Sequence, residues 1–387
     1  MKKVSVLEVS NIRNQSVEFF AGTKKYIATG DVDEKIIKSF TEITYDNRPS
    51  RANIEVKLGQ VLFARMKGTN KVIQIDELNQ EYIYSTGFCV LEPSELVTTD
   101  YLRTFLKSDL FQVQKDKYSK GATQKAINNE GISKIKIPLP PLETQKKIVE
   151  TFDEAQALID ARKEQIRLMD ELIKSRFFEM FGDLYNNSRN WIKAPMGDYL
   201  TILTDFSANG SYEYLDSNVV MYDKPNYALM VRTTDLEKQD FERDVKYIDE
   251  NAYRILEKSK VFGNEIIMNK IGSAGKVYLM PCLNRPVSLG RNAFLFRYNE
   301  SINVVYMYYL LTSGYGTNEI MQHVRGAVTK TITKEAVRSV RILVPPIEKQ
   351  NEFANSVRQI EESKFEMLKS LDEIYATYQS IVQQFYG

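Results

Sequence analysis

The sequence predicts an α+β protein in which two related α/β domains alternate with two long coiled-coil helices. A segment that occurs twice and a heptad pattern after each copy predict this fold class. The segment "KGATQKAINNEGISKIKIPLPPLETQ" (120–145) aligns without gaps with "RGAVTKTITKEAVRSVRILVPPIEKQ" (325–350). Chance is a poor explanation for a match of this density, so the chain contains an internal repeat.

Each copy of the repeat leads into a long helical segment. Apolar residues recur there at spacings of four and three over roughly five heptads, which is the signature of a coiled coil. The first seam comprises Ile148, Phe152, Ala155, Ile159, Arg162, Ile166, Met169, Ile173, Arg176 and Met180, and the second comprises Phe353, Val357, Ile360, Lys364, Met367, Leu371, Ile374, Tyr378, Ile381 and Phe385. Each helix is expected to span about 38 residues, or ~55 Å.

A plain amphipathic helix packed on its own domain is the alternative for each segment, but such helices usually have a wider apolar stripe. The basic residues Arg162, Arg176 and Lys364 interrupt the seams and are expected to control register and orientation. Gly182 and Gly387 occupy matching positions and are expected to end the two helices.

The repeat and the helices divide the chain into four expected parts. These are a first domain (1–143), a first helix (144–182), a second domain (183–348) and a second helix (349–387). The prolines of "IKIPLPPLETQ" and "VRILVPPIEKQ" are expected to end the last strand of each domain just before its helix, because proline lacks a backbone donor.

The two domains share further features. "GQVLFARMKGTNKV" (59–72) and "GNEIIMNKIGSAGKV" (263–277) each predict two strands joined by a glycine-containing turn. The segments 101–114 and 305–322 are both helical in pattern. By contrast, "DFSANGSYEYLDSNVVMYDKPNY" (205–227) finds no clear partner in the first half. One scaffold with two different faces would recognise two different things.

Composition excludes several classes of protein. The 387 residues are 43% hydrophobic and 27% charged, with a net charge of +1. No apolar run of about 18 residues occurs, so no membrane span is expected. Cys89 and Cys282 are too few for a disulfide framework, and a cytoplasmic location is expected. The N-terminus shows no signal peptide and begins close to the first domain, so little room is expected for an additional N-terminal helix.

Few residues indicate catalysis. His323 is the one histidine, so a histidine-based triad or a His/Cys metal cluster is not expected. "GSAGKV" lacks the glycine spacing and the hydroxyl residue of a phosphate-binding loop. Asp46 followed by "EVK" (Glu55–Lys57) mimics the carboxylate–carboxylate–lysine pattern of metal nucleases, but such triplets are common. We therefore expect a chain without catalytic residues of its own.

Over essentially its whole length the chain resembles the specificity subunit of type I restriction–modification enzymes. The most specific parts are "GATQKAI…IPLPPLETQKKIV", its second copy "GAVTKTI…ILVPPIEKQ", the helices after them, and the "GTNKV" and "GSAGKV" hairpins. The resemblance implies two DNA target-recognition domains, each recognising half of a split sequence. It also implies an antiparallel pair of helices that sets the spacing between the half-sites and docks the modification subunits.

The resemblance further implies the partners and the cofactors. Double-stranded DNA, modification (methyltransferase) subunits, two in number, and restriction/translocase subunits are the expected partners. S-adenosylmethionine, Mg²⁺ and ATP are expected on those subunits, and no cofactor or metal on this chain. Recognition modules of type IIB and IIG systems share this plan and remain open, as does a coiled-coil adaptor that binds proteins through its two globular ends.

Candidate DNA contacts follow from side-chain chemistry. Lysine and arginine suit phosphate and guanine, and asparagine and glutamine suit adenine. The candidates are Lys120, Gln124, Lys125, Arg325, Thr329 and Lys330 from the glycine-containing loops; Arg65, Lys67, Lys71, Asn269, Lys270 and Lys276 from the hairpins; Arg291; and, further, Arg48, Arg51 and Arg232. A tight turn with solvated lysines is the alternative for each loop, and a solvent-facing strand charge is the alternative for each hairpin.

Overall fold

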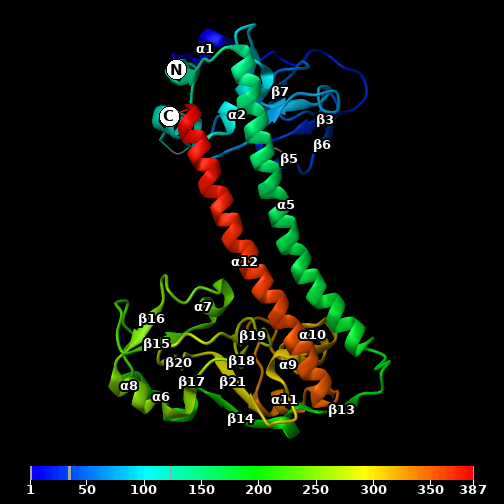
Figure 1. The fold of residues 1–387 in the computed structure, drawn as a ribbon, viewed down its shortest axis with the longest axis vertical. Helices are drawn as coiled ribbons and strands as arrows, with labels where there is room; N and C mark the ends of the chain where they lie inside the picture. Colours follow the sequence, from blue (N-terminus) through cyan, green and yellow to red (C-terminus); the bar gives the residue numbers. More distant parts are fainter. Residues whose placement is uncertain (1, 34–35, 123, 387) are drawn as a thin grey trace. The chain divides into compact units, whose positions relative to one another are not determined.

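The computed structural model describes residues 2–33, 36–122 and 124–386, and it divides the chain into two compact units. Unit 1 comprises residues 1–165 and 367–387, and unit 2 comprises residues 166–366. The two long helices are α5 (Leu142–Phe181) and α12 (Ile347–Tyr386), labelled in Figure 1. Each helix therefore begins in one unit and ends in the other.

Unit 1 is built from short strands and a few helices. Its elements before α5 are β1 (Lys3–Ser5), α1 (Val6–Val9), β2 (Ser10–Ile12), β3 (Lys24–Ile27), η1 (Thr29–Asp31), β4 (Val32–Asp33), β5 (Ile36–Ile37), β6 (Thr41–Ile43), β7 (Ala52–Ile54), β8 (Val61–Ala64), β9 (Val72–Gln74), β10 (Ile83–Ser85), β11 (Phe88–Pro93), α2 (Thr99–Lys107), α3 (Asp109–Tyr118), α4 (Asn129–Ser133) and β12 (Lys136–Pro138).

Unit 2 contains a similar series of elements. They are β13 (Ile192–Pro195), η2 (Met196–Tyr199), β14 (Leu200–Asp205), η3 (Phe206–Asn209), α6 (Tyr212–Asn218), β15 (Ala228–Val231), α7 (Thr233–Lys238), β16 (Lys246–Ile248), α8 (Glu250–Ile255), η4 (Glu257–Ser259), β17 (Lys260–Val261), β18 (Glu265–Asn269), β19 (Val277–Met280), β20 (Val287–Leu289), β21 (Ala293–Tyr298), α9 (Val304–Thr312), α10 (Gly314–Met321), α11 (Lys334–Ser339) and β22 (Arg341–Val344).

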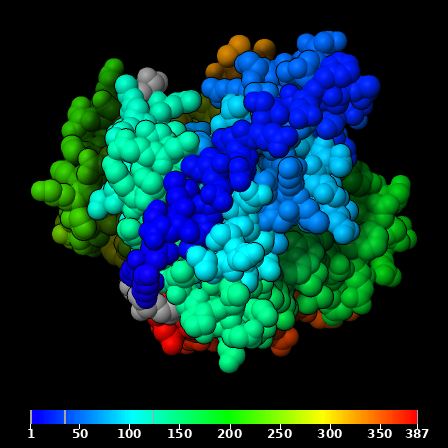
Figure 2. Space-filling view, turned by 90° about the horizontal axis from the view of Figure 1, so that it is seen from above, coloured from blue at the N-terminus to red at the C-terminus, as the bar shows by residue number. Residues whose placement is uncertain are grey.

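The two four-stranded sheets have the same topology in both units. The order β2-β11-β8-β9 in unit 1 corresponds to β14-β21-β18-β19 in unit 2, and β6-β3-β10-β7 corresponds to β16-β15-β20-β17. One parallel pair occurs at the same place in each second sheet, β3 with β10 and β15 with β20. The two-stranded pair β1–β12 of unit 1 corresponds to the pair β13–β22 of unit 2. The N-terminal segment, dark blue in Figure 2, crosses the surface of unit 1. The predicted pair of α/β domains is confirmed.

Alternation along the central strands explains the layers. In β8, Val61 and Phe63 face a core with helices α2 and α3, while Leu62 and Ala64 face a core with the second sheet. Successive side chains of a strand point to opposite faces, so a strand covered on both sides is apolar throughout. Each unit is therefore a helix layer, a first sheet and a second sheet.

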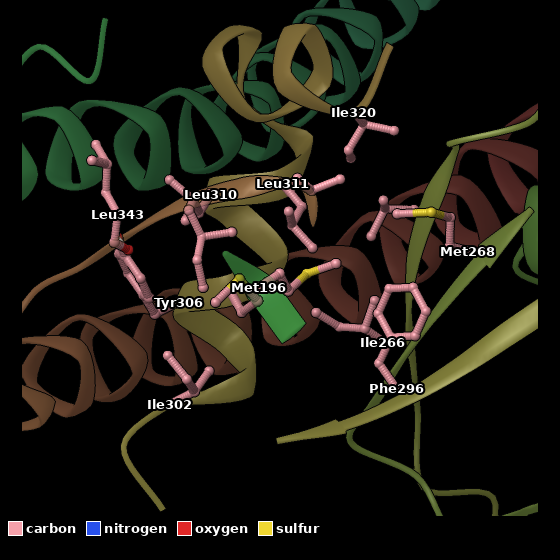
Figure 3. Close-up of a cluster of buried hydrophobic side chains, with 14 of the residues drawn as sticks. Met196, Ile266, Met268, Phe296, Ile302, Tyr306, Leu310, Leu311, Ile320 and Leu343 are labelled. Atoms are coloured by element: carbon pink, nitrogen blue, oxygen red, sulfur yellow. The ribbon is translucent and has the colours of Figure 1, made fainter. Parts of the chain in front are cut away.

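The core of unit 2 on the helix side is shown in Figure 3. Tyr306 and Leu310 of α9 lie among side chains from the sheet and from the strand that precedes α12. The labelled residues are Met196, Ile266, Met268, Phe296, Ile302, Tyr306, Leu310, Leu311, Ile320 and Leu343. The corresponding core of unit 1 includes the matching Tyr101 of α2.

The two predicted helical segments of the domains each consist of two helices. Helix α2 ends before Ser108, whose extended backbone starts α3 and whose hydroxyl caps it. Ser313 does the same between α9 and α10. Serine is a favoured N-cap, because its side chain accepts a hydrogen bond from an otherwise unpaired N–H.

The heptad seam is confirmed within each unit. In unit 1, the Phe152 ring near the start of α5 stacks on Tyr386 at the end of α12, with 5.6 Å between centroids. In unit 2, Phe177 near the end of α5 packs against Phe353 at the start of α12, at 5.2 Å. The helices therefore run antiparallel in both units. All the predicted seam residues are buried or half-buried.

Two of the seam cations pair with acids of the opposite helix in unit 2. Arg176 contacts Glu352 (3.1 Å), and Lys364 contacts Asp170. These ion pairs match the predicted role in register. Gly182 has φ +75° and its N–H donates to the Phe178 carbonyl at 2.7 Å, which ends α5 as expected. Gly387, the other expected helix stop, lies outside the described residues.

Candidate nucleic-acid interface

The glycine-containing loop of unit 1 (120–126) lies directly on the β8–β9 turn (65–71). The Lys67 N–H donates to the Lys125 carbonyl (2.9 Å), and the Ile127 N–H donates to the Arg65 carbonyl (3.0 Å). Lys120 and Ala126 exchange both backbone hydrogen bonds at the base of the loop, at 3.0 Å each. Two segments that the sequence places far apart thus form one surface, which we call the unit 1 loop–hairpin surface.

Unit 2 repeats this construction. The Gly272 N–H donates to the Lys330 carbonyl (3.0 Å), and the Ile332 N–H donates to the Lys270 carbonyl (3.1 Å). The loop 325–331 and the β18–β19 turn (270–276) form the unit 2 loop–hairpin surface. The predicted loop and hairpin residues are therefore brought together in each unit.

The glycines of the loops are required by the turn. Gly121 has φ +136° and Gly326 has φ +105°, which residues with a side chain rarely adopt. A Cβ atom at Gly121 would lie 2.5 Å from the Gln124 carbonyl oxygen, and one at Gly326 would lie 2.1 Å from that of Thr329. The tight turn considered as an alternative is present, and it leaves the loop residues exposed at its tip.

Some cations of the unit 1 surface are engaged with the protein itself. The Arg65 guanidinium donates to the Ile127 carbonyl (3.1 Å) and to Asn129 Oδ1 (2.9 Å), and the Lys71 ammonium donates to the Thr29 carbonyl (2.7 Å). Lys120 contacts Glu130 at 3.4 Å. These groups hold the loop and the hairpin in place.

Other lysines of the two surfaces are open to a ligand. Lys67, Lys125 and Lys330 are exposed, and within the described residues their ammonium groups form no ion pair. Gln124 and Thr329 are exposed at the loop tips beside them. Unpaired ammonium groups on fixed loops suit contacts with phosphate.

Lys115 of α3 is a buried cation that the sequence did not reveal. Its side chain is 0% exposed, and its ammonium donates to the carbonyls of Ala64 and Thr69 on the hairpin. Burial lowers the pKa of Lys115 to about 8, although Asp116 opposes the shift. The sequence of α3 gave no sign of this role, because the groups that Lys115 contacts are backbone carbonyls of another part of the chain.

Asp205 forms ion pairs with two lysines at and beside the unit 2 loop–hairpin surface. This buried carboxylate contacts Lys270 (2.7 Å) and Lys334 (2.9 Å), the second of which the sequence analysis did not select. Burial by itself would raise the pKa of Asp205, but hydrogen bonds from both lysines outweigh it and hold the pKa below its usual value. The cluster keeps a net positive charge at fixed positions.

The remaining hairpin and loop candidates of unit 2 differ in accessibility. Asn269 is 3% exposed and its amide donates to the Tyr278 hydroxyl (3.3 Å), so it is not available to a base in this structure. Lys276 is exposed and contacts Glu237 at 3.0 Å. The Arg325 guanidinium donates to the Gln322 carbonyl at 2.8 Å and stays exposed.

Three further arginine candidates lie elsewhere. Arg48 lies over the Tyr45 ring at 3.7 Å, and Arg51 is exposed. Arg232 contacts the buried Asp235 at 2.6 Å and donates to the Asp244 carbonyl. None of the three belongs to a loop–hairpin surface.

One carboxylate of the nuclease-like triplet is engaged with a residue outside the triplet. Glu55 contacts Lys24 at 3.7 Å, and in the described part of the chain no group of three His, Cys, Asp or Glu residues could hold a metal ion.

The chain matches the family model "type I restriction modification DNA specificity domain" over residues 3–168 and 198–374. The chain belongs to this family. Each match covers most of one predicted domain and part of the helix that follows it. The protein is thus a DNA specificity subunit with two target-recognition domains, and such subunits recognise DNA rather than catalyse a reaction.

Curated relatives of the chain are also named specificity subunits. The putative type I restriction enzyme MjaX specificity subunit of Methanocaldococcus jannaschii is 23% identical over 322 residues, which cover 80% of this chain and 73% of the relative. The EcoKI specificity subunit of Escherichia coli K12 is 33% identical over 89 residues, 23% of this chain and 19% of the relative.

Solved structures show the same fold. A chain from a study of complex assembly and conformational transition of the type I R-M system covers 100% of this specificity subunit and 97% of its own length, with a TM-score of 0.61 and 19% identity. The S subunit of a type I system from M. genitalium covers 100% and 96%, with a TM-score of 0.54 and 12% identity. Among the described residues of the specificity subunit, no helix is long and apolar enough to cross a membrane.

Proposed function

We propose that each unit of this specificity subunit recognises one half of a bipartite, asymmetric DNA target through its loop–hairpin surface. The observation that carries the proposal is the repeated docking of a glycine-containing loop on a hairpin, with exposed lysines on both. The loop is fixed by backbone hydrogen bonds to the hairpin, for example from Gly272 to Lys330, so its cations are held in place before DNA binds. Fixed groups lose less conformational entropy on binding.

Phosphate and base contacts are assigned to different side chains. Lys67, Lys125 and Lys330 form no ion pair among the described residues and are proposed to bind phosphate, which positions the duplex. Gln124 and Thr329 extend from the loop tips and are proposed to face base edges. Arg65, Lys71 and Lys270 support the surface through contacts within the protein.

The antiparallel helices are proposed to set the gap between the two half-sites and to dock two modification subunits. Exposed apolar side chains on the outer faces of the helices, such as Leu168, Leu172 and Phe365, support a docking role. Restriction/translocase subunits would join through the modification subunits. S-adenosylmethionine, Mg²⁺ and ATP are proposed to bind those partners, in the cytoplasm, rather than this chain.

Methylation profiling tests the proposal. A host that carries this gene together with its modification subunit should acquire methylation at one split sequence, and a host without it should not. Inserting one heptad into the middle of both α5 and α12 should lengthen the unrecognised gap between the half-sites and leave both half-sites unchanged, because only the helices become longer. An unchanged gap would contradict the proposed spacing role. Equal binding to all duplexes would instead favour a protein-binding adaptor.

A further inference from the structure

A pocket of about 280 Å³ lies in unit 2, and the segment that has no counterpart in unit 1 lines part of it. The segment 205–227 forms η3 and α6 and supplies Phe206, Val219 and Met221 to the pocket. The connection from β20 to β21 supplies Arg291 and Asn292 on the other side. The floor is apolar, since Phe206, Val219 and Met230 are 6%, 7% and 1% exposed.

Arg291 is held in one position at this pocket. Its guanidinium contacts Asp216 of α6 at 2.8 Å, and it lies 5.2 Å from the ring centroids of both Phe206 and Tyr212. Only one of its N–H groups is used in the contact with Asp216, and its side chain is 37% exposed. A guanidinium braced by a carboxylate and two rings is prepared to donate two parallel hydrogen bonds.

The pocket adjoins the unit 2 loop–hairpin surface. The Lys270 N–H donates to the Asn292 carbonyl at 2.7 Å, so a backbone hydrogen bond connects the pocket rim to the hairpin turn. Asp205, which holds Lys270 and Lys334, is the residue before Phe206 in the chain. A duplex whose phosphate lies against Lys330 on this surface would therefore present its base edges near Arg291.

Arg232 on the pocket rim does not compete for this role. Its Nε and Nη2 atoms donate to Asp235 and to the Asp244 carbonyl, so two of its three guanidinium nitrogens are engaged. Arg291 donates through Nη2 alone in its contact with Asp216, so it keeps more donors for a ligand than Arg232 does.

We propose that this pocket is a base-recognition site of unit 2: Arg291 donates to N7 and O6 of a guanine, and the apolar floor receives the 5-methyl group of an adjacent thymine. The inference rests on the proposed function of the two surfaces. It adds to the base contact proposed for Thr329 a second one, at a pocket that the unmatched segment lines in part. Arginine with guanine and an apolar side chain with the thymine methyl are the favoured pairings in the major groove.

The test uses the specificity subunit assembled with its modification subunits and the target defined by methylation profiling. Arg291→Gln should weaken binding roughly tenfold or more and should relax the requirement for one guanine in one half-site. 7-Deazaguanine lacks the N7 acceptor but keeps O6. Placed at that guanine, it should weaken the wild-type complex, by less than Arg291→Gln does, and should change the binding of the variant little. Uracil in place of the adjacent thymine should weaken wild-type binding roughly fourfold.

The control is Arg254→Gln, which removes an exposed arginine paired with Glu250 on α8 and outside the pocket. It should leave the target and the affinity unchanged. A uniform loss of affinity on all sequences with Arg291→Gln, an unchanged guanine requirement, or equal binding of uracil and thymine would each overturn the inference. If the wild-type complex binds all duplex sequences equally, the proposed function itself is wrong. This outcome differs from those that overturn only the role of Arg291, so the two failures are distinguishable.

Discussion

The side chain of Gln145, at the start of α5, accepts a hydrogen bond from the backbone N–H of Thr98, the N-cap of α2, at 2.9 Å. Its amide also donates to the carbonyls of Leu96 (2.9 Å) and Pro140 (3.0 Å). Gln145 is 0% exposed, so one buried side chain connects the start of α2, the proline-containing segment before α5, and α5 itself. The joint between domain and helix is therefore fixed.

The same joint between domain and long helix occurs in unit 2. Gln350 Oε1 accepts from the Asn303 N–H (2.8 Å), and its amide donates to the carbonyls of Ser301 (3.0 Å) and Pro345 (2.8 Å). Gln350, Asn303, Ser301 and Pro345 are separated from Gln145, Thr98, Leu96 and Pro140 by the same number of residues that separates the two copies of the repeat.

Gln145→Ala should lower the free energy of unfolding by about 3 kcal/mol, because it leaves one N–H and two carbonyls buried without partners. Urea denaturation followed by circular dichroism measures this. Gln165→Ala, at an exposed position of the same helix, is the control and should change the value by no more than about 0.5 kcal/mol. Equal effects of the two substitutions would show that the joint adds nothing to stability.

Tyr386→Phe should leave unit 1 as stable or make it more stable. The Tyr386 hydroxyl is buried, and it has no hydrogen-bond partner among the described residues. Removing an unsatisfied polar group removes a desolvation cost, while the ring keeps its stack on Phe152. Thermal denaturation provides the measurement.

Tyr101→Phe is the matched comparison. The Tyr101 hydroxyl donates to the Pro138 carbonyl at 2.9 Å, so its loss should cost about 1 kcal/mol. If both tyrosine variants lose the same stability, the assignment of the Tyr386 hydroxyl as unpaired is wrong.

Lys115 should make stability depend on pH. Burial lowers its pKa in the folded state to about 8, against the usual 10.5. Between these values the unfolded chain binds more protons, so this group stabilises the fold increasingly as pH rises from about 8 to about 10.5. Relative to Lys115→Met, the wild type should gain about 1 kcal/mol between pH 8 and pH 9. A difference between the two proteins that stays constant with pH would rule this out.

Single substitutions Lys67→Ala, Lys125→Ala and Lys330→Ala should weaken DNA binding by similar factors on target and non-target duplexes. Each should also reduce the slope of log affinity against log salt by about one, because each removes one phosphate contact. Salt titrations of the assembled complex give the slopes. Lys258→Ala, an exposed lysine of η4 outside both surfaces, should leave the slope unchanged. A change of target sequence with any of the three would mean that the lysine contacts bases.

The sequence alone determined the repeat, the two helices and the family. Heptad periodicity is local, and a seam such as Ile148, Phe152 and Ile159 is visible without coordinates because burial of one helix face imposes it. The joints were visible because the prolines and Gln145/Gln350 must recur where the same backbone geometry recurs. The hairpins were visible because glycine is needed in their turns.

Only the tertiary structure decided which of the candidate cations are engaged within the protein and which are not. Arg65 and Lys330 look alike as basic residues in a sequence, yet Arg65 binds backbone carbonyls whereas Lys330 forms no ion pair among the described residues. The buried Lys115, the burial of Asn269 and the cluster around Asp205 depend on partners distant in the chain. The energy of a charge is set by the groups that surround it in space, and spacing along one strand or helix does not report them.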